Sequence, residues 1–146
     1  MLDMTVPAAF GGAGTDYVSY ALALMEIAAA DGATSTAFQV HNSLACLPIL
    51  QHGNPDQKER YLKPLARGEQ LGAICLPESG AGSDAAAITT RARRVGNRFV
   101  LSDATQFITS RKSTDLALVF YEGTSDIQRL VIDHELSRET VFQGVS

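Results

Sequence analysis

The sequence has few cysteines, no long apolar run and no large basic cluster, and each shortage argues against a class of function. Its two cysteines, Cys46 and Cys75, lie far apart without C-x-x-C spacing. This spacing predicts neither a zinc site nor a disulfide framework, and a reducing compartment fits best. No apolar stretch approaches the roughly 20 residues of a membrane helix, and the first residues lack the pattern of a signal or transit peptide. We therefore expect a soluble protein.

The charge balance and the histidines also argue against two classes of partner. The chain of 146 residues has 12 basic and 16 acidic residues, a net charge of −4, and its basic clusters are short. Nucleic acid is therefore not an expected partner. His41, His52 and His134 are scattered without metal-ligand spacing, so we expect core or surface roles for them. The length predicts one globular domain or two small packed lobes.

Residues 17–30 are predicted to form the first helix. Either Thr15 or Asp16 can cap it, because both side chains can accept hydrogen bonds from the first turn. Apolar residues recur inside the segment at helical spacing, and Glu26 is its only charge. We therefore expect this helix to be largely buried and to end at the Asp-Gly pair 31–32.

Two further helices are predicted in the first half. The second begins at a cap supplied by Ser35 or Thr36 and continues to the His-Gly pair 52–53. The third, more polar helix spans 56–66 behind an N-cap at Asn54, with proline in its first turn.

The second half is predicted to form strands and one last helix. Residues 71–76 are a short apolar run typical of a buried strand, and 116–121 is another strand candidate. Residues 88–95 and 98–109 are predicted to pair as a hairpin around a Gly-Asn turn. Apolar residues at helical spacing predict a helix over 126–138. The fold class is therefore α+β: an N-terminal helical segment packed on a small antiparallel β domain, plus one C-terminal helix.

Two segments could carry chemistry. Residues 77–84, PESGAGSD, follow the first strand, and their small side chains let backbone N–H groups approach an anion such as a pyrophosphate. The alternative is a loop that simply turns the chain. Residues 121–129, YEGTSDIQR, place Glu122 just before the predicted last helix, where by itself it can be an ordinary N-terminal helix charge.

Several segments together resemble the acyl-CoA dehydrogenase flavoprotein family. The loop 77–84 is similar to the family's Thr-Glu-Pro-x-Ala-Gly-Ser-Asp element, and 121–129 is similar to the stretch that carries the glutamate base of many members. Further similar segments are GGAGTDY at 11–17, HNSL at 41–44, QKERYL at 57–62 and QFIT at 106–109.

The resemblance implies an FAD-dependent oxidoreductase that introduces an α,β double bond into acyl-CoA thioesters. Glu122 would remove the α-proton while hydride leaves the β-carbon for the flavin. Phe107 and Thr109 would face the flavin ring, although by pattern alone they are one aromatic and one β-branched residue of a strand. The full set of implied cofactor contacts is Leu76, Glu78, Ala81, Gly82, Ser83, Phe107, Thr109, Thr124 and Asp126.

The resemblance also suggests a domain division and three departures. It implies a helical domain at 1–69, a truncated β domain at 70–120, and a remnant of a C-terminal helical domain at 121–146. The rest of the β domain and most of the family's helical bundle are missing between 120 and 121, so apolar surface should be exposed on both parts. Pro77 stands in place of a threonine, Ser79 of a proline and Phe107 of a tryptophan. We expect weak or absent FAD retention and little turnover.

The sequence therefore leaves three functions open. The first is an acyl-CoA dehydrogenase domain that acts on acyl-CoA when a partner chain or self-association completes its site, with an electron-transfer flavoprotein or similar acceptor. The second is an inactive relative that serves as an interaction or folding module. The third is a phosphate-binding α+β protein unrelated to flavin. Bacterial cytoplasm, or else the mitochondrial matrix, is the expected location.

Overall fold

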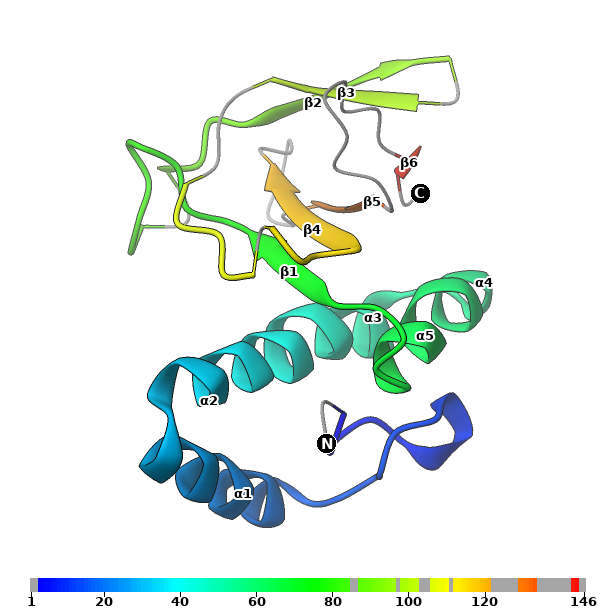
Figure 1. Cartoon of the computed structure of the whole chain (residues 1–146). Helices are drawn as coiled ribbons and strands as arrows, with labels where there is room; N and C mark the ends of the chain where they lie inside the picture. Colours follow the sequence, from blue (N-terminus) through cyan, green and yellow to red (C-terminus); the bar gives the residue numbers. More distant parts are fainter. Residues whose placement is uncertain are drawn as a thin grey trace.

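The protein folds as three layers, with helices on one side, a four-stranded sheet in the middle and a two-stranded hairpin on the other side (Figure 1). The computed structural model describes residues 3–84, 87–96, 98–102, 106–110, 112–121, 129–133 and 143–144. The mixture of a helical part and a small β part confirms the predicted α+β class.

The helical layer occupies most of the first half of the chain. It begins with a short 3-10 turn and continues as α-helical stretches joined by two π-helical segments. In chain order these are η1 (Ala8–Phe10), α1 (Tyr17–Ala30), α2 (Gly32–Gln39), the π segment η2 (Val40–Cys46), α3 (Leu47–His52), α4 (Pro55–Gln57), the π segment η3 (Lys58–Leu62) and α5 (Lys63–Ala66).

Side-chain caps fix where the helices begin. Of the two candidates at the first helix, Asp16 is the cap, and its carboxylate accepts hydrogen bonds from the first-turn backbone at 2.8 and 2.9 Å. Asn54 and Gln57 form a reciprocal capping box at the start of α4, which confirms the N-cap predicted there.

The predicted start of the second helix was wrong. Asp31, not Ser35 or Thr36, caps α2, because its carboxylate accepts hydrogen bonds from the backbone of Ala33 and Thr34. The Ser35 hydroxyl instead donates to a backbone carbonyl of α1 at 3.0 Å. Asp31 therefore ends α1 with its backbone N–H, which donates to the Ile27 carbonyl, and starts α2 with its carboxylate, so the connection is a single residue.

The expectation that α1 is largely buried was also wrong. Val18, Leu22 and Met25 are 70%, 57% and 66% exposed, and only Tyr20 of this helix is buried. The reason is that α1 packs mainly along α2 at the edge of the helical layer (Figure 1). Exposed apolar residues on α1 and on the hairpin agree with the expectation of uncovered apolar surface on both parts.

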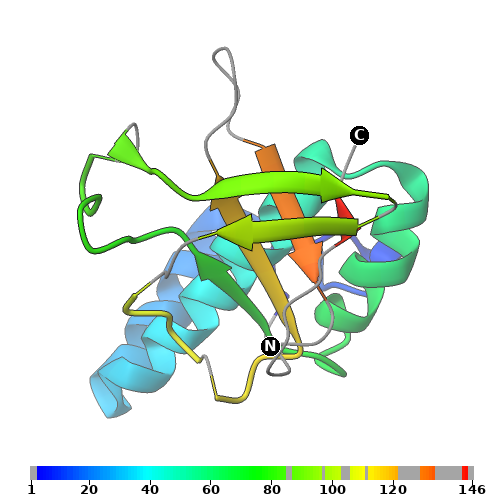
Figure 2. The same ribbon diagram turned by 90° about the horizontal axis from the view of Figure 1, so that it is seen from above.

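The central sheet has the order β1-β4-β5-β6. Its strands are β1 (Gly72–Cys75), β4 (Leu116–Tyr121), β5 (Arg129–Asp133) and β6 (Gln143–Gly144). β1 and β4 are parallel, whereas the other neighbours are antiparallel, so the prediction of an antiparallel β domain was wrong for this pair. The long connection after β1 carries the hairpin across the sheet and lets the chain re-enter in the same direction (Figure 2).

The predicted C-terminal helix was wrong over the part that the structure describes. Residues 129–133 form β5, and Val131 pairs with Val119 of β4. β-branched residues suit a strand as well as an apolar helix face, and pairing with β4 decides between the two because it satisfies an open strand edge.

β4 separates two clusters of buried side chains. Leu116 and Leu118 face the helices and join the larger cluster, which also contains Ile49, Leu62 and Leu65. Alternate residues of β4 face the hairpin, formed by β2 (Arg91–Val95) and β3 (Arg98–Ser102), and contact Ala92 and Leu101. Among the helices in the described residues, none combines the length and apolar character needed to cross a membrane.

Candidate functional site

The loop after β1 contains a closed turn, Glu78–Ala81, and continues into Gly82 and Ser83. We call the exposed residues Ser79, Gly80, Gly82 and Ser83 the loop tip. Glu78 and Ala81 exchange two backbone hydrogen bonds, of 3.0 and 3.3 Å, and the Ala81 side chain is 2% exposed. The backbone N–H groups of Ser79, Gly80, Gly82 and Ser83 have no hydrogen-bond partner within the part of the chain that the structure describes.

Space is open above this tip. A Cβ atom built on Gly80 or Gly82 meets no heavy atom within 4 Å. Four unpaired N–H donors beside open space are the arrangement that backbone anion sites use, because an oxygen can approach the donors without displacing a side chain. The tip can therefore hold an anion such as a phosphate.

The carboxylate of Glu78, at the base of the turn, accepts four hydrogen bonds. The backbone N–H and hydroxyl of Thr89 donate to Oε2 at 2.8 and 2.7 Å. The backbone N–H of Thr90 donates to Oε1 at 2.7 Å, and its hydroxyl donates to the same oxygen. Burial by itself would raise the pKa of Glu78, but the bonds from Thr90 and Thr89 outweigh it and lower the pKa to about 2.

A residue with an exposed aromatic side chain follows a segment that is bonded to this loop. The backbone N–H of Gln106 donates to the Pro77 carbonyl at 2.8 Å, which brings the following residue, Phe107, next to the loop. Phe107 is 91% exposed and has a φ of 55°. A bulky residue in the left-handed region is uncommon and costs conformational energy, and such residues cluster at ligand sites. Its neighbour Ile108 packs against the buried cluster between β4 and the hairpin, and this contact anchors the segment.

The structure brings together part of the predicted site. Leu76 directly follows β1, and Ala81, Gly82 and Ser83 belong to the loop beside Phe107. Thr109 is half-buried two residues beyond Phe107. Glu122, Thr124 and Asp126 lie outside the described residues.

Sequence reasoning missed the threonine pair that binds Glu78. Thr89 and Thr90 lie 11 and 12 residues after Glu78, on the far side of the loop. No local spacing rule connects a carboxylate with donors across a loop of this length, so the sequence contained no usable signal.

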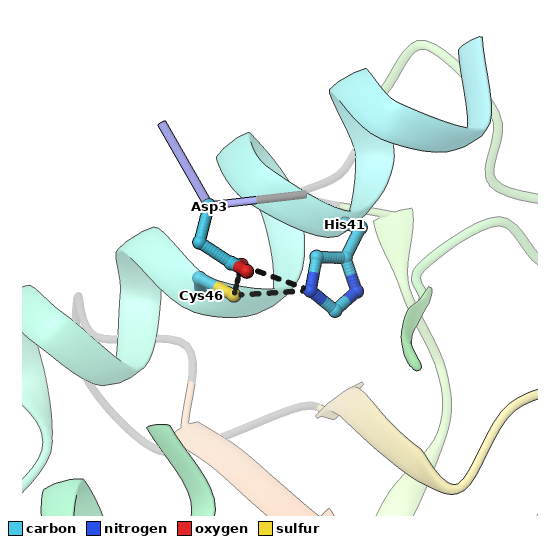
Figure 3. Close-up of side chains that lie close together, drawn as sticks. All are labelled: Asp3, His41 and Cys46. Carbon is cyan, nitrogen blue, oxygen red and sulfur yellow. Dashed lines mark hydrogen bonds and ion pairs between the residues drawn. The ribbon is translucent and has the colours of Figure 1, made fainter. Parts of the chain in front are cut away.

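A second group of polar side chains is fully enclosed in the helical layer (Figure 3). His41 Nε2 lies 3.1 Å from Asp3 Oδ1 and 3.2 Å from the Leu65 carbonyl, and the Cys46 Sγ lies 3.5 Å from the same Asp3 oxygen. All three side chains are buried. The set has the residue types of a metal site.

The hydrogen bonds of His41 argue against metal binding. Its Nδ1 accepts a hydrogen bond from the Gly72 backbone N–H at 3.1 Å, so the proton of a neutral ring is on Nε2, the atom that a metal would need. Burial and the neighbouring Asp3 carboxylate also raise the pKa of the Cys46 thiol far above its usual range, which keeps it protonated. We therefore interpret this cluster, Asp3–His41–Cys46, as a closed hydrogen-bond network that joins the N-terminal segment, the helices and β1.

The chain is similar to known proteins in both sequence and fold. Residues 1–69 match the family model described as acyl-CoA dehydrogenase, N-terminal domain. Human mitochondrial short-chain specific acyl-CoA dehydrogenase is 40% identical over 120 residues, which cover 82% of this chain and 29% of that protein.

Two solved structures show the same fold. Butyryl-CoA dehydrogenase from Megasphaera elsdenii is 30% identical, with a TM-score of 0.86 over 94% of this chain and 38% of its own. Glutaryl-CoA dehydrogenase from Mycobacterium smegmatis in complex with FADH2 is 32% identical, with a TM-score of 0.81 over 96% of this chain and 39% of its own. The chain thus spans well under half the length of each of these relatives. On the sequence and fold together, it belongs to the acyl-CoA dehydrogenase family.

Proposed function

We propose that the chain supplies one side of an FAD site in an enzyme that desaturates acyl-CoA thioesters between the α and β carbons. The observation that carries this proposal is the pairing of a loop tip that has four unpaired N–H donors with an exposed, strained Phe107 beside it. A dinucleotide with a flat tricyclic ring needs both features, since its pyrophosphate requires donors and its ring requires an apolar face.

The described residues fit two parts of this cofactor, the pyrophosphate and the flavin ring. Ser79, Gly80, Gly82 and Ser83 would donate backbone hydrogen bonds to pyrophosphate oxygens, for which the tip has both donors and room. Phe107 would place its ring against the flavin. When bound, FAD supplies the acceptor for hydride from the β-carbon, chemistry that side chains cannot perform. Leu76 and Thr109 remain proposed neighbours of the cofactor, as do Thr124 and Asp126.

The sheet topology supports Glu122 as the proposed base. Because β1 and β4 are parallel, with Cys75 opposite Val119, their carboxyl ends lie at the same end of the sheet. The loop tip follows one of these ends, and Glu122 follows the other in sequence, directly after Tyr121. Ligand sites of open sheets form at such carboxyl edges. A carboxylate there would take the acidic α-proton of a thioester.

Substrate and partners follow from the family. We propose an acyl-CoA substrate, an electron-transfer flavoprotein or a similar acceptor, and self-association or a partner chain to cover the exposed apolar surface. Bacterial cytoplasm, or else the mitochondrial matrix, remains the proposed location.

The test is equilibrium dialysis of the purified chain against FAD, FMN and ADP, each detected by absorbance. We expect weak FAD binding that exceeds the binding of ADP, because only FAD provides a ring for Phe107. Equal binding of ADP would favour a phosphate site unrelated to flavin and would refute this proposal. We also expect little bleaching by acyl-CoA, and what bleaching there is should disappear in Glu122→Gln while FAD binding stays.

A second candidate is an interaction module without catalysis. The exposed Val18, Leu22 and Met25 on α1 favour it, because a stripe of this kind is rarely left uncovered on a soluble protein. In that case Glu122→Gln changes nothing, whereas a charged residue in place of Leu22 abolishes the association that sedimentation measures.

A further inference from the structure

We infer that Glu78 is a positioning residue, whose carboxylate binds Thr89 and Thr90 and so fixes the turn that presents the loop's N–H groups to the cofactor. This goes beyond a direct contact between Glu78 and FAD. It rests on the proposed function for the identity of the ligand, although the geometry of the turn stands independently of it.

Both carboxylate oxygens of Glu78 are fully occupied by protein donors. Each oxygen accepts one backbone N–H and one hydroxyl, and the residue is 8% exposed. A carboxylate with four charge-assisted hydrogen bonds has neither the free lone pairs nor the exposure for a cofactor contact. Its backbone is equally committed, because Glu78 and Ala81 bond to each other in both directions.

The bonds of Glu78 connect the loop to a rigid part of the protein. Thr90 is 1% exposed and immediately precedes β2, whose Ala92 packs against the face of β4. The loop tip is therefore held between the end of β1 on one side and the hairpin on the other. Loss of the Glu78 bonds would free the tip, and the four N–H donors would no longer be preorganised for one ligand.

Charge and position predict opposite effects of the same substitution. A carboxylate under an anion site repels the anion, so its removal alone should tighten FAD binding. Loss of the hydrogen bonds should weaken it, because a Gln side chain keeps only one acceptor oxygen and places an NH₂ group against two donors. If Glu78 positions the turn, the second effect is the larger one.

The experiment measures FAD affinity by equilibrium dialysis and amide exchange by mass spectrometry in the whole chain and in four variants. Glu78→Gln should bind FAD about tenfold more weakly than the unaltered chain and should exchange the amides of Thr89 and Thr90 at least about tenfold faster. Thr90→Val should show a smaller loss, and Thr90→Ser, which keeps the hydroxyl, should restore binding. Glu26→Gln, on the exposed surface of α1, is the charge-matched control and should change neither quantity.

The outcomes separate this inference from the proposed function. Tighter FAD binding by Glu78→Gln, or unchanged exchange at Thr89 and Thr90, would overturn the positioning role. If the unaltered chain binds no FAD, the proposed function fails, and the exchange rates alone decide whether Glu78 holds the turn. Should Glu78→Gln not fold, as judged by fast exchange in β1 and β4, the comparison of Thr90→Val with Thr90→Ser replaces it: equal FAD affinity in these two variants would overturn the inference.

Discussion

The helical layer and the loop after β1 use polar groups in opposite ways. In the Asp3–His41–Cys46 network each of the three side chains is buried and bonded to other protein groups. At the loop tip, four backbone N–H groups have no partner in the described residues, and a Cβ atom built on Gly80 or Gly82 meets no heavy atom within 4 Å. Buried polar groups need partners for stability, whereas exposed and unpaired donors are available to a ligand. The difference assigns a structural role to the first region and supports the proposed binding role of the second.

His41→Ala should break the closed network and have the largest effect. It leaves the Asp3 carboxylate without its imidazole donor and the Gly72 N–H without an acceptor, both in the interior. We expect a loss of about 3–5 kcal/mol in the free energy of unfolding, measured by urea denaturation. The matched control is His52→Ala, at an exposed helix end, which should cost less than about 0.5 kcal/mol. Equal costs would contradict the assignment of His41 as a structural junction.

The proposed site depends on Glu78. The contribution of Glu78 to the pH dependence of the free energy of unfolding should be the next largest effect. Since the folded pKa of about 2 lies below the ordinary 4.5, Glu78 stabilises the fold fully above pH 4.5. This contribution disappears as the pH falls through 2, and it amounts to up to about 3 kcal/mol. Urea denaturation between pH 5 and pH 2 should show a shallower decline in Glu78→Gln than in the unaltered chain.

The pH experiment compares the unfolding free energies of Glu78→Gln and the unaltered chain, because other carboxylates titrate between pH 5 and pH 2 in both proteins. Hydrogen bonds from Ser19 and from Thr34 lower the pKa of the cap residues Asp16 and Asp31, respectively. Their contribution is common to both proteins and cancels. Parallel pH curves would contradict the buried, four-donor environment of Glu78.

A pair of glycines sharpens the contrast between filled and open space. In Gly72→Ala the new Cβ would lie 2.4 Å from the Cβ of Ala45, where β1 meets the π segment η2. We expect a cost of about 1–3 kcal/mol from overpacking. Gly80→Ala, at the loop tip, meets nothing and should change stability by less than about 0.5 kcal/mol. Thermal denaturation of both variants makes the comparison, and a costly Gly80→Ala would show that the tip is not open.

Asn54→Ala gives the smallest expected effect and calibrates the others. It removes a capping box at the start of α4, outside the Asp3–His41–Cys46 network and the loop, where Asn54 Oδ1 accepts from the Gln57 backbone at 2.9 Å. The expected cost is about 1 kcal/mol. Gln51→Ala, an exposed change within α3, serves as its control in the same urea titration. A cost as large as that of His41→Ala would mean that the stability assay does not resolve local from central interactions.

The sequence predicted the elements that local signals encode. A first cap at Thr15 or Asp16, of which the structure uses Asp16, the cap at Asn54, the strand at 116–121 and a hairpin after residue 88 follow from neighbouring residues, and each is present. It failed at one local signal, the cap of α2, which is Asp31 and not Ser35 or Thr36, and where distant contacts decide. The strand at 129–133 forms by pairing with β4, and the exposure of α1 depends on which elements cover it.

The same distinction holds for the site. The small residues of the loop were visible in the sequence, but the threonines that bind Glu78 lie across the loop and were not. Likewise, His41 and Cys46 are five residues apart, a spacing that shares no face of an α-helix. They meet because η2 is π-helical, which brings residues i and i+5 together.

The most direct test of the central claim is a nuclear magnetic resonance titration of the 15N-labelled chain with FAD. If the unpaired donors of the loop tip hold the pyrophosphate, the amide signals of Ser79, Gly80, Gly82 and Ser83 should shift saturably, together with that of Phe107. Amides around His41 should stay in place because their partners are internal. Unmoved loop amides at FAD concentrations that saturate the chain, or shifts confined to the helical layer, would contradict the account.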